Sequence, residues 1–440
     1  MLPSDSPLRD RTYRRLFAAQ LVALAGTGLL TVALALLAFD LEPGAAGQVL
    51  GTVLALKMVA YIVVSLLSTE FVARVSPSLS PRRLLVILDF ARAALALTLP
   101  FVTALWQVYV LITVLSACSA AFKPVFQATL PAVLGDTERY TRALSLTRLA
   151  YDLENVLSPA LAAALMLWMD SRLLFVGTAV GFVLSAVWIA ATTFPADDSP
   201  GAASPRGSIG AAARSFVRTP RLRGLVALNL CVASVGAMVI VNGVQYIRGF
   251  LGLGETDLAI AMMASGAGSM LVALLLPRLL RSLGERKVMV GGAVGTSLAL
   301  FVGWFGLSFG GILALWFVLG AGMALIQTPM GRVLTQSTHP EQRPAAFAMQ
   351  FSASHACWLV TYLLAAWLPN SGDGVVAFVV LGALALAAAL SSLLVWPSQP
   401  DAVPHTHALP ASHPHVANGG EPHCHDYIID ALHPRWPKPV

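Results

Sequence analysis

Residues 147–159 read Thr-Arg-Leu-Ala-Tyr-Asp-Leu-Glu-Asn-Val-Leu-Ser-Pro, and the interpretation of the whole chain starts from this stretch. It places Arg148, Asp152, Glu154 and Asn155 inside a segment that is otherwise long and apolar enough to cross a lipid bilayer. Carboxylates at membrane depth are costly, and by default they mark the path of a substrate or an ion. The stretch therefore predicts a membrane protein with a polar site inside the bilayer.

The composition of the chain agrees with this class. Of its 440 residues, 57% are hydrophobic and 11% are charged, whereas a soluble domain carries about 25% charged residues. The net charge of +6 comes from arginines between apolar runs, so it does not indicate nucleic-acid binding. The sequence contains no CxxC pair, cleavable signal or phosphate-binding loop, and it does not indicate an enzyme.

Twelve apolar runs follow one another, each close to the ~20 residues that a helical span requires. They cover residues 16–39, 48–69, 84–102, 106–130, 143–168, 173–194, 225–247, 258–280, 288–309, 312–334, 345–368 and 375–396. We predict an all-α membrane protein with two six-helix halves, residues 1–194 and 221–397. A linker over 195–220, with a short surface helix at 209–217, joins the halves, and a tail over 398–440 follows.

The two halves share a sequence register. Residues 123–125, Lys-Pro-Val, correspond to residues 328–330, Thr-Pro-Met, and the stretch 147–159 corresponds to 350–362. Parallel six-helix repeats with a site between them at mid-membrane are a known plan of transporters. The register therefore predicts a transport site between the halves, to which each half contributes at matching places: Asp152 opposite His355, and Glu154 opposite Cys357.

Two interpretations of the fifth span remain open. Asp152 and Arg148 are four residues apart, so they lie on one helix face and can pair, in which case they only stabilise the helix. Alternatively, a carboxylate faces the transport path. Glu154 points nearly opposite to Asp152, so one of the two faces the cavity and the other faces the bundle, and the sequence does not decide which.

The other candidate residues of the path also have both a structural and a ligand interpretation. His355 is either a hydrogen-bonded core residue or a metal ligand, and its equivalence with Asp152 favours the ligand. Imidazole with carboxylate suits nickel, cobalt or zinc. Cys357 lies on another helix face and is expected to be a small buried hydrophobic residue. Met330 and Asn242 are weaker candidates for ligands of the path.

Four further charges lie within apolar runs. Lys57 and Lys123 either neutralise a carboxylate, respond to proton movement, or extend their amino groups toward the membrane surface. Asp89 and Arg92 are three residues apart, and we expect them to form a structural pair.

The tail has a different chemistry, because it is rich in proline and polar residues and has no apolar period. We predict that it is disordered. Closely spaced imidazoles on a flexible chain can converge on one metal ion, and they bind it when neutral, above about pH 6.5. The other interpretation is an inert polar tail. Its candidate ligands are His405, His407, His413, His415, His423, Cys424, His425 and His433.

Over residues 11–396 the chain resembles the major facilitator superfamily, with its two six-helix halves and central linker. Residues 155–163, Asn-Val-Leu-Ser-Pro-Ala-Leu-Ala-Ala, are similar to the fifth-helix Gly-Pro motif of its exporters, with Ser158 and Ala162 where glycines are usual. The loop after the second span is degenerate, since Ala73-Arg74 stands where Asp-Arg is expected. The end of the tail, from His425 to Pro437, is similar to that of nickel-resistance exporters of this superfamily.

The resemblance implies efflux of Ni²⁺, or of Co²⁺, across the inner membrane of a bacterium by alternating access and proton antiport. The metal ion and protons would then compete for the same side chains. We expect no prosthetic group, no nucleic-acid partner, and a monomer in the lipid bilayer. Two alternatives remain: an exporter of drugs or siderophores, favoured by a large aromatic-lined cavity, and a membrane metal sensor, which would bind the ion without transporting it.

The distribution of arginine predicts the orientation of the chain. Positive residues precede the first span and fill the central gap, whereas the opposite connections carry little beyond Arg172 and Arg248. The positive-inside rule puts both termini and the linker in the cytoplasm. A reporter fused after Val440, or inserted within residues 199–208, should therefore show cytoplasmic activity. A periplasmic signal at either place would contradict the twelve-span topology.

Overall fold

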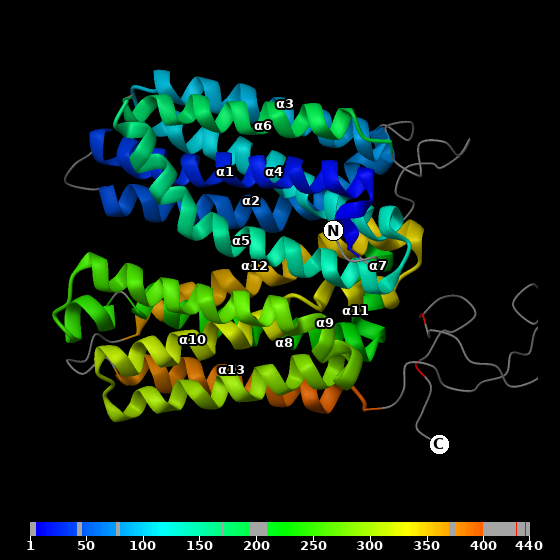
Figure 1. The fold of residues 1–440 in the computed structure, drawn as a ribbon, viewed down its shortest axis with the longest axis vertical. Coiled ribbons are helices and arrows are strands. Elements are labelled where there is room, and N and C mark those ends of the chain that lie inside the picture. Colours follow the sequence, from blue (N-terminus) through cyan, green and yellow to red (C-terminus); the bar gives the residue numbers. More distant parts are fainter. Residues whose placement is uncertain are drawn as a thin grey trace, which may run out of the picture.

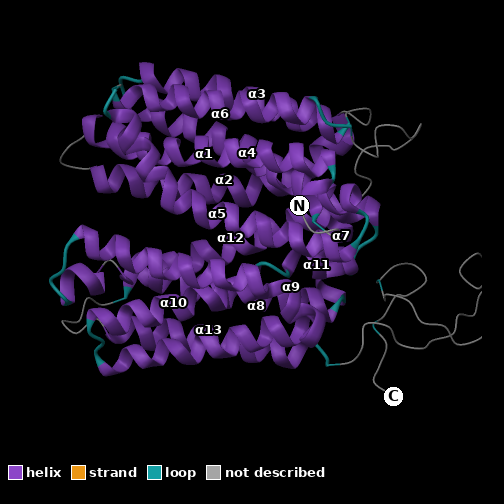
Figure 2. Cartoon of the chain, viewed as in Figure 1, coloured by secondary structure: helices purple, strands orange, loops and turns teal. Residues whose placement is uncertain are grey.

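The computed structural model describes residues 6–41, 46–75, 80–168, 170–193, 209–243, 245–368 and 375–398, together with Ile428 and Trp436. Throughout these ranges the chain forms helices and connecting loops without a strand (Figure 2). The eight candidate metal ligands of the tail, His405 to His433, lie outside the described residues. The predicted all-α membrane fold is confirmed.

The first half contains six long helices, and each coincides with one predicted span. They are α1 (Arg11–Leu41), α2 (Ala46–Val75), α3 (Pro81–Thr98), α4 (Leu105–Leu134), α5 (Thr137–Met166) and α6 (Leu174–Ala190). Local signals explain where α5 begins, because the side chain of Asp136 accepts hydrogen bonds from the backbone N–H groups of Glu138 and Arg139. Such an N-cap satisfies donors that the first helical turn leaves unpaired.

The second half covers the other six predicted spans with helices that are partly interrupted. They are α8 (Pro220–Ala237), continued by the π-helical segments η4 (Met238–Asn242) and η5 (Gln245–Phe250), then α9 (Glu255–Leu300), α10 (Phe309–Gln327), α11 (Met330–Gln336), α12 (Arg343–Trp367) and α13 (Val375–Val395). The expected surface helix, α7 (Ile209–Arg218), lies between the halves. Within the described ranges, seven helices are long and apolar enough to cross a membrane.

Helix α9 contains two of the predicted spans, 258–280 and 288–309, and it changes direction at one glycine. Gly284 has φ of 74° and ψ of 165°, which is not a helical conformation. Only glycine reaches such a backbone conformation without steric cost, so the break falls where the sequence permits it. The range Glu255–Leu300 therefore consists of two helices that meet at Gly284, with the basic residues Arg281, Arg286 and Lys287 around the break.

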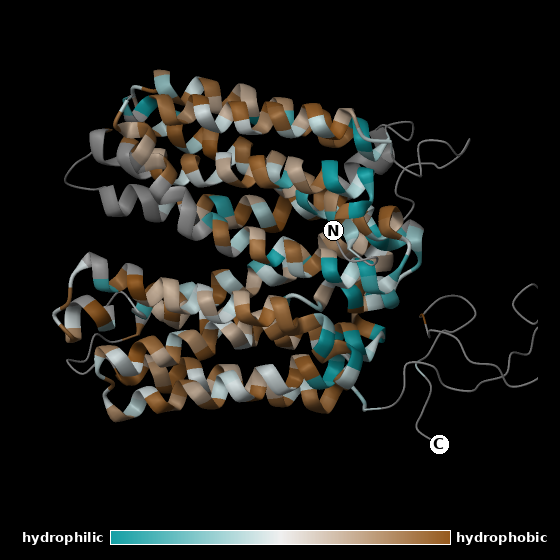
Figure 3. Cartoon of the chain, in the orientation of Figure 1, coloured by the Kyte–Doolittle hydropathy of each residue, from teal (hydrophilic) through white to brown (hydrophobic). Residues whose placement is uncertain are grey.

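Helices α1–α6 form one bundle and α8–α13 form the other (Figure 1). Each bundle has its own hydrophobic core, with Phe175 and Phe182 in the first and Trp316 and Phe378 in the second. The bundles meet where α5 packs on α9 and where α2 and α4 pack on α12. Hydrophilic residues gather at the end of the molecule that carries α7, which we call the basic end (Figure 3).

Close packing of α9 on α10 depends on glycine. A Cβ added at Gly268 would lie 2.0 Å from the carbonyl oxygen of Phe317, and one at Gly320 would lie 1.9 Å from that of Ser265. By contrast, Gly266, two residues before Gly268 on the same helix, has nothing within 4 Å of its added Cβ. Small residues bring helix backbones close together in membranes, where apolar side chains gain little by leaving lipid.

We predict that Gly268→Ala lowers the thermal stability of the detergent-solubilised protein, because its methyl group would force the two helix backbones apart. Overpacking of this kind costs about 1–3 kcal/mol. Gly266→Ala is the matched control, and it should be neutral or stabilise by up to ~1 kcal/mol through helix propensity. Equal melting temperatures for the two variants would contradict the assigned role of Gly268.

Candidate functional site

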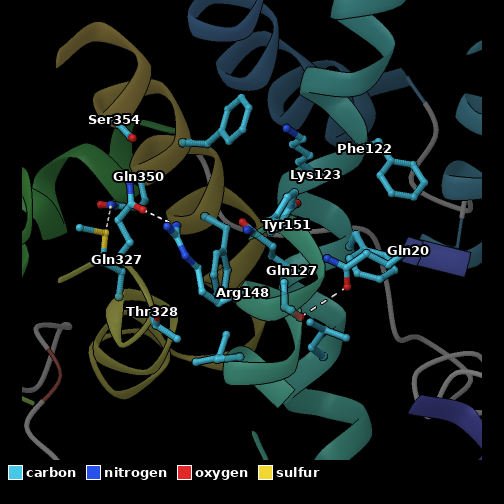
Figure 4. Close-up of a pocket in the computed structure, with 18 of the residues that line it drawn as sticks. Gln20, Phe122, Lys123, Gln127, Arg148, Tyr151, Gln327, Thr328, Gln350 and Ser354 are labelled. Carbon is cyan, nitrogen blue, oxygen red and sulfur yellow. Dashed lines mark hydrogen bonds between the residues drawn. The ribbon is translucent and has the colours of Figure 1, made fainter. Parts of the chain in front are cut away.

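A cavity of about 290 Å³ lies between the two bundles. Its wall comes from α1, α3, α4 and α5 of the first half and from α10, α11 and α12 of the second (Figure 4). Because both halves contribute, a molecule in this cavity contacts surfaces that can move relative to each other. The lining residues that Figure 4 labels are Gln20, Phe122, Lys123, Gln127, Arg148, Tyr151, Gln327, Thr328, Gln350 and Ser354.

The wall combines positive charge, amides and aromatic rings. Its cationic side chains are Arg92, Lys123 and Arg148, and the residues that the structure places in the wall include no aspartate or glutamate. Four glutamines supply both donors and acceptors, and four phenylalanines supply apolar surface. The glutamines are Gln20, Gln127, Gln327 and Gln350, and the phenylalanines are Phe122, Phe126, Phe347 and Phe351.

Arg148 links the halves across the cavity. Its Nε donates to the Ser269 hydroxyl at 2.7 Å and its Nη1 donates to Oε1 of Gln327 at 2.6 Å. Both acceptors belong to the second half and both are uncharged. The predicted pairing of Arg148 with Asp152 remains a prediction, because the side chains of Asp152 and Asn155 lie outside the described residues.

Next to the cavity, Glu154 shares its surroundings with two lysines. Lys57 and Lys123 both act on its carboxylate electrostatically. The Lys57 amino group lies 5.6 Å from the centre of the Tyr61 ring, and that of Lys123 lies 5.3 Å from the same ring. These contacts place the lysines inside the protein, so the structure gives them partners other than the membrane surface. A positive group over an aromatic face is attracted by about 0.5–2 kcal/mol.

His355 packs between two aromatic rings beside this group. Its ring centre lies 4.1 Å from that of Phe351 and 5.0 Å from that of Tyr61. Nδ1 lies 2.7 Å from the Phe351 carbonyl oxygen. Since a carbonyl only accepts, Nδ1 carries the proton and the lone pair of a neutral ring is on Nε2.

The other predicted site residues are divided between the cavity and the bundles. Met330 lines the cavity, and its sulfur accepts a hydrogen bond from Gln350 Nε2 at 3.3 Å. Asn242 is buried within the second half and donates to the Ala365 carbonyl at 3.3 Å. Cys357 is partly buried on α12 and is not among the residues of the cavity wall.

Asp89 and Arg92 form an ion pair, as their spacing suggests. Asp89 also accepts a hydrogen bond from the Ser185 hydroxyl at 2.7 Å. The guanidinium of Arg92 lies between the rings of Phe122 and Phe182, with its carbon 4.1 Å and 4.5 Å from their centres. The pair therefore joins α3, α4 and α6 at the wall of the cavity.

Sequence reasoning missed the four glutamines and the phenylalanines of the wall. The criterion of costly intramembrane charge selects ionisable residues, whereas a neutral amide within an apolar run gives a weaker signal. Gln127 and Gln327 also stand three and two residues from the matched prolines, Pro124 and Pro329. That proximity to the internal repeat was the one available clue.

The two halves are held together at the basic end. Arg332 of α11 donates to the Thr141 hydroxyl of α5 at 2.9 Å and forms an ion pair with Glu285, next to the break in α9. The hydroxyl of Ser65 on α2 hydrogen-bonds with Ser352 on α12. The Arg332–Thr141 and Ser65–Ser352 contacts each join the first half to the second.

Comparison with known proteins places the chain in a family. The family model described as Major Facilitator Superfamily matches residues 16–282 and 225–418. The two-bundle helical fold and the cavity between the bundles are those of a membrane transporter, not an enzyme. The chain belongs to the Major Facilitator Superfamily. A search of the curated proteins finds no match.

Solved structures share the fold at low sequence identity. A bacterial homologue of the iron transporter ferroportin, in an outward-facing state, has a TM-score of 0.72 and 16% identity, over 88% of this chain and 99% of that chain. The human organic anion transporter TETRAN has a TM-score of 0.70 and 14% identity, over 89% and 100%. The fucose:proton symporter of E. coli has a TM-score of 0.68 and 13% identity, over 89% and 100%.

We predict that Arg332→Ala loosens the basic end, because it removes the link to Thr141 and leaves Glu285 without this ion pair. In a background with the native cysteines replaced by serine, labelling of Ser354→Cys in the cavity wall from the basic side should increase severalfold. Arg281→Ala is the control, because the exposed Arg281–Glu138 pair, at 3.6 Å, is of a kind that contributes about 0–1 kcal/mol. If Arg332→Ala left the labelling rate unchanged, Arg332 would not contribute to closure.

Proposed function

We propose that this chain is a secondary transporter that exports a divalent transition metal, Ni²⁺ first and Co²⁺ second, from the cytoplasm of a bacterium across its inner membrane. The observation that carries the proposal is the geometry of His355. Histidines that bind metals almost always donate their other ring N–H to a carbonyl or carboxylate, which fixes the tautomer. His355 has this arrangement with Phe351, on a helix that lines the cavity.

The tail supports the same proposal from the sequence. Residues 398–440 hold seven of the nine histidines of the chain, six of them in three closely spaced pairs, and one cysteine. Among the described residues, no three histidine, cysteine, aspartate or glutamate side chains gather into a metal-binding group. In this proposal the metal is cargo that the chain binds transiently.

Glu154 is the group that we assign to proton coupling. Its carboxylate has two lysines acting on it, so gaining or losing a proton changes the balance of charge beside the cavity. Binding of a cation near His355 would favour the ionised carboxylate, whereas protonation would favour release of the cation. Competition of this kind is what proton antiport requires.

A second candidate function is export of an organic anion, of the drug or siderophore type. The observation that favours it is the wall of the cavity, where Lys123 and Arg148 stand among four phenylalanine rings. Aromatic and apolar linings with a few convergent polar groups are typical of sites for small organic molecules.

We predict that inverted membrane vesicles containing this protein accumulate radiolabelled Ni²⁺ when their interior is acidic, because protons leaving the vesicle would drive metal uptake. Asp152→Asn and His355→Ala should each abolish most of this flux, and the double variant should be little worse than either single variant if both groups hold the same ion. The measurement is the initial rate of uptake per molecule of membrane-inserted protein.

His339→Ala is the matched control, since His339 lies between α11 and α12 and does not line the cavity. It should transport like the unaltered protein. Normal flux per molecule in both the Asp152→Asn and His355→Ala proteins would exclude this ligand pair. Binding of Ni²⁺ without any flux would instead identify a metal sensor.

A further inference from the structure

The size of the cavity indicates cargo larger than a bare metal ion. At about 290 Å³, it is close to the lower end of the ≈ 300–1,000 Å³ range of sites for small molecules. The rings of Phe122, Phe126, Phe347 and Phe351 take up part of the wall and offer no atoms that ligate nickel. Such surfaces pack instead against the carbon skeleton of an organic molecule.

The charges around the cavity are unfavourable for an unaccompanied divalent cation. Lys57, Arg92, Lys123 and Arg148 are positive, whereas the nearby carboxylates are Asp89, Glu154 and, counted from the sequence, Asp152. Four positive groups against three negative ones leave an excess of one positive charge. Because the bilayer does not screen charge as water does, this excess attracts anions into the cavity.

The donors of the wall are suited to carboxylate oxygens. Lys123 comes from α4, Arg148 from α5 and Gln350 from α12, and Figure 4 shows them around one space with Gln127 and Gln327. Ammonium, guanidinium and amide groups are the common partners of carboxylates in proteins. Lys123 stands over the faces of Tyr61 and Phe351, with its amino group 5.3 Å and 5.7 Å from their centres, so these two contacts hold it without neutralising it.

We propose that the cavity binds a small carboxylate-bearing anion, and that the exported metal crosses the membrane as an anionic carboxylate complex. This inference rests on the proposed metal export and specifies the form of the cargo. Citrate is a suitable probe, because a divalent metal with one citrate trianion carries one net negative charge. In the complex, the carboxylates meet Lys123 and the amides, and the metal faces His355, which packs on the same Phe351 ring that Lys123 contacts.

The experiment uses the full chain in proteoliposomes, with radiolabelled Ni²⁺ and, separately, labelled citrate. We expect citrate to raise the rate of Ni²⁺ transport about tenfold, a difference of about 1.4 kcal/mol, with one citrate transported per metal ion. Lys123→Gln should abolish most of the citrate-dependent rate, whereas Lys123→Arg should retain it because the charge remains. Lys287→Gln, at an exposed position of the basic end, is the matched control and should transport normally.

The experiment distinguishes a failure of the proposed metal complex from a failure of the proposed metal export. Transport of Ni²⁺ at the same rate without citrate, with no citrate moving, would overturn the complex and leave metal export intact. Transport of citrate while the Ni²⁺ label does not move would support the anion site and overturn metal export. Movement of neither label, with correctly folded protein in the liposomes, would overturn the inference.

Discussion

The cost of placing charge inside a bilayer is the constraint on which this structure depends. The bilayer core has no water to solvate a guanidinium or an ammonium group, so each one needs polar partners from the protein. Arg148 finds Ser269 and Gln327 on the opposite half, and Lys123 finds aromatic faces and Glu154. These requirements gather the polar side chains of both bundles into one cavity.

The side chains between the two bundles differ in kind from those in the core of each bundle. Within each bundle, apolar side chains and closely approaching glycines form a continuous core. The contact between the bundles also includes hydroxyl groups, an exposed ion pair, the ring of Tyr61 against α12, and the arginine that crosses the cavity. Contacts of the second kind can be exchanged for other partners at little cost. The arrangement therefore suits two rigid bodies that change their relative position around a fixed site.

The chemistry of the cavity links the two candidate functions. Metal export, as proposed, would use His355 with the carboxylates of α5 as ligands, whereas the cations and rings of the wall favour an organic anion. A metal held by a carboxylate ligand satisfies both sets of groups at once.

The sequence by itself determined the helices, the internal repeat and the ionisable residues of the site. Apolar runs predict spans well because a backbone in lipid has to satisfy its hydrogen bonds within its own helix. The range Glu255–Leu300 agrees with this, because it consists of two helices that the non-helical backbone of Gly284 separates. Only the tertiary structure decided which polar groups meet. It brought Glu154 near Lys57 and Lys123 and assembled the glutamines and phenylalanines of the wall, since these neighbours come from helices far apart in the chain and depend on how the two bundles pack.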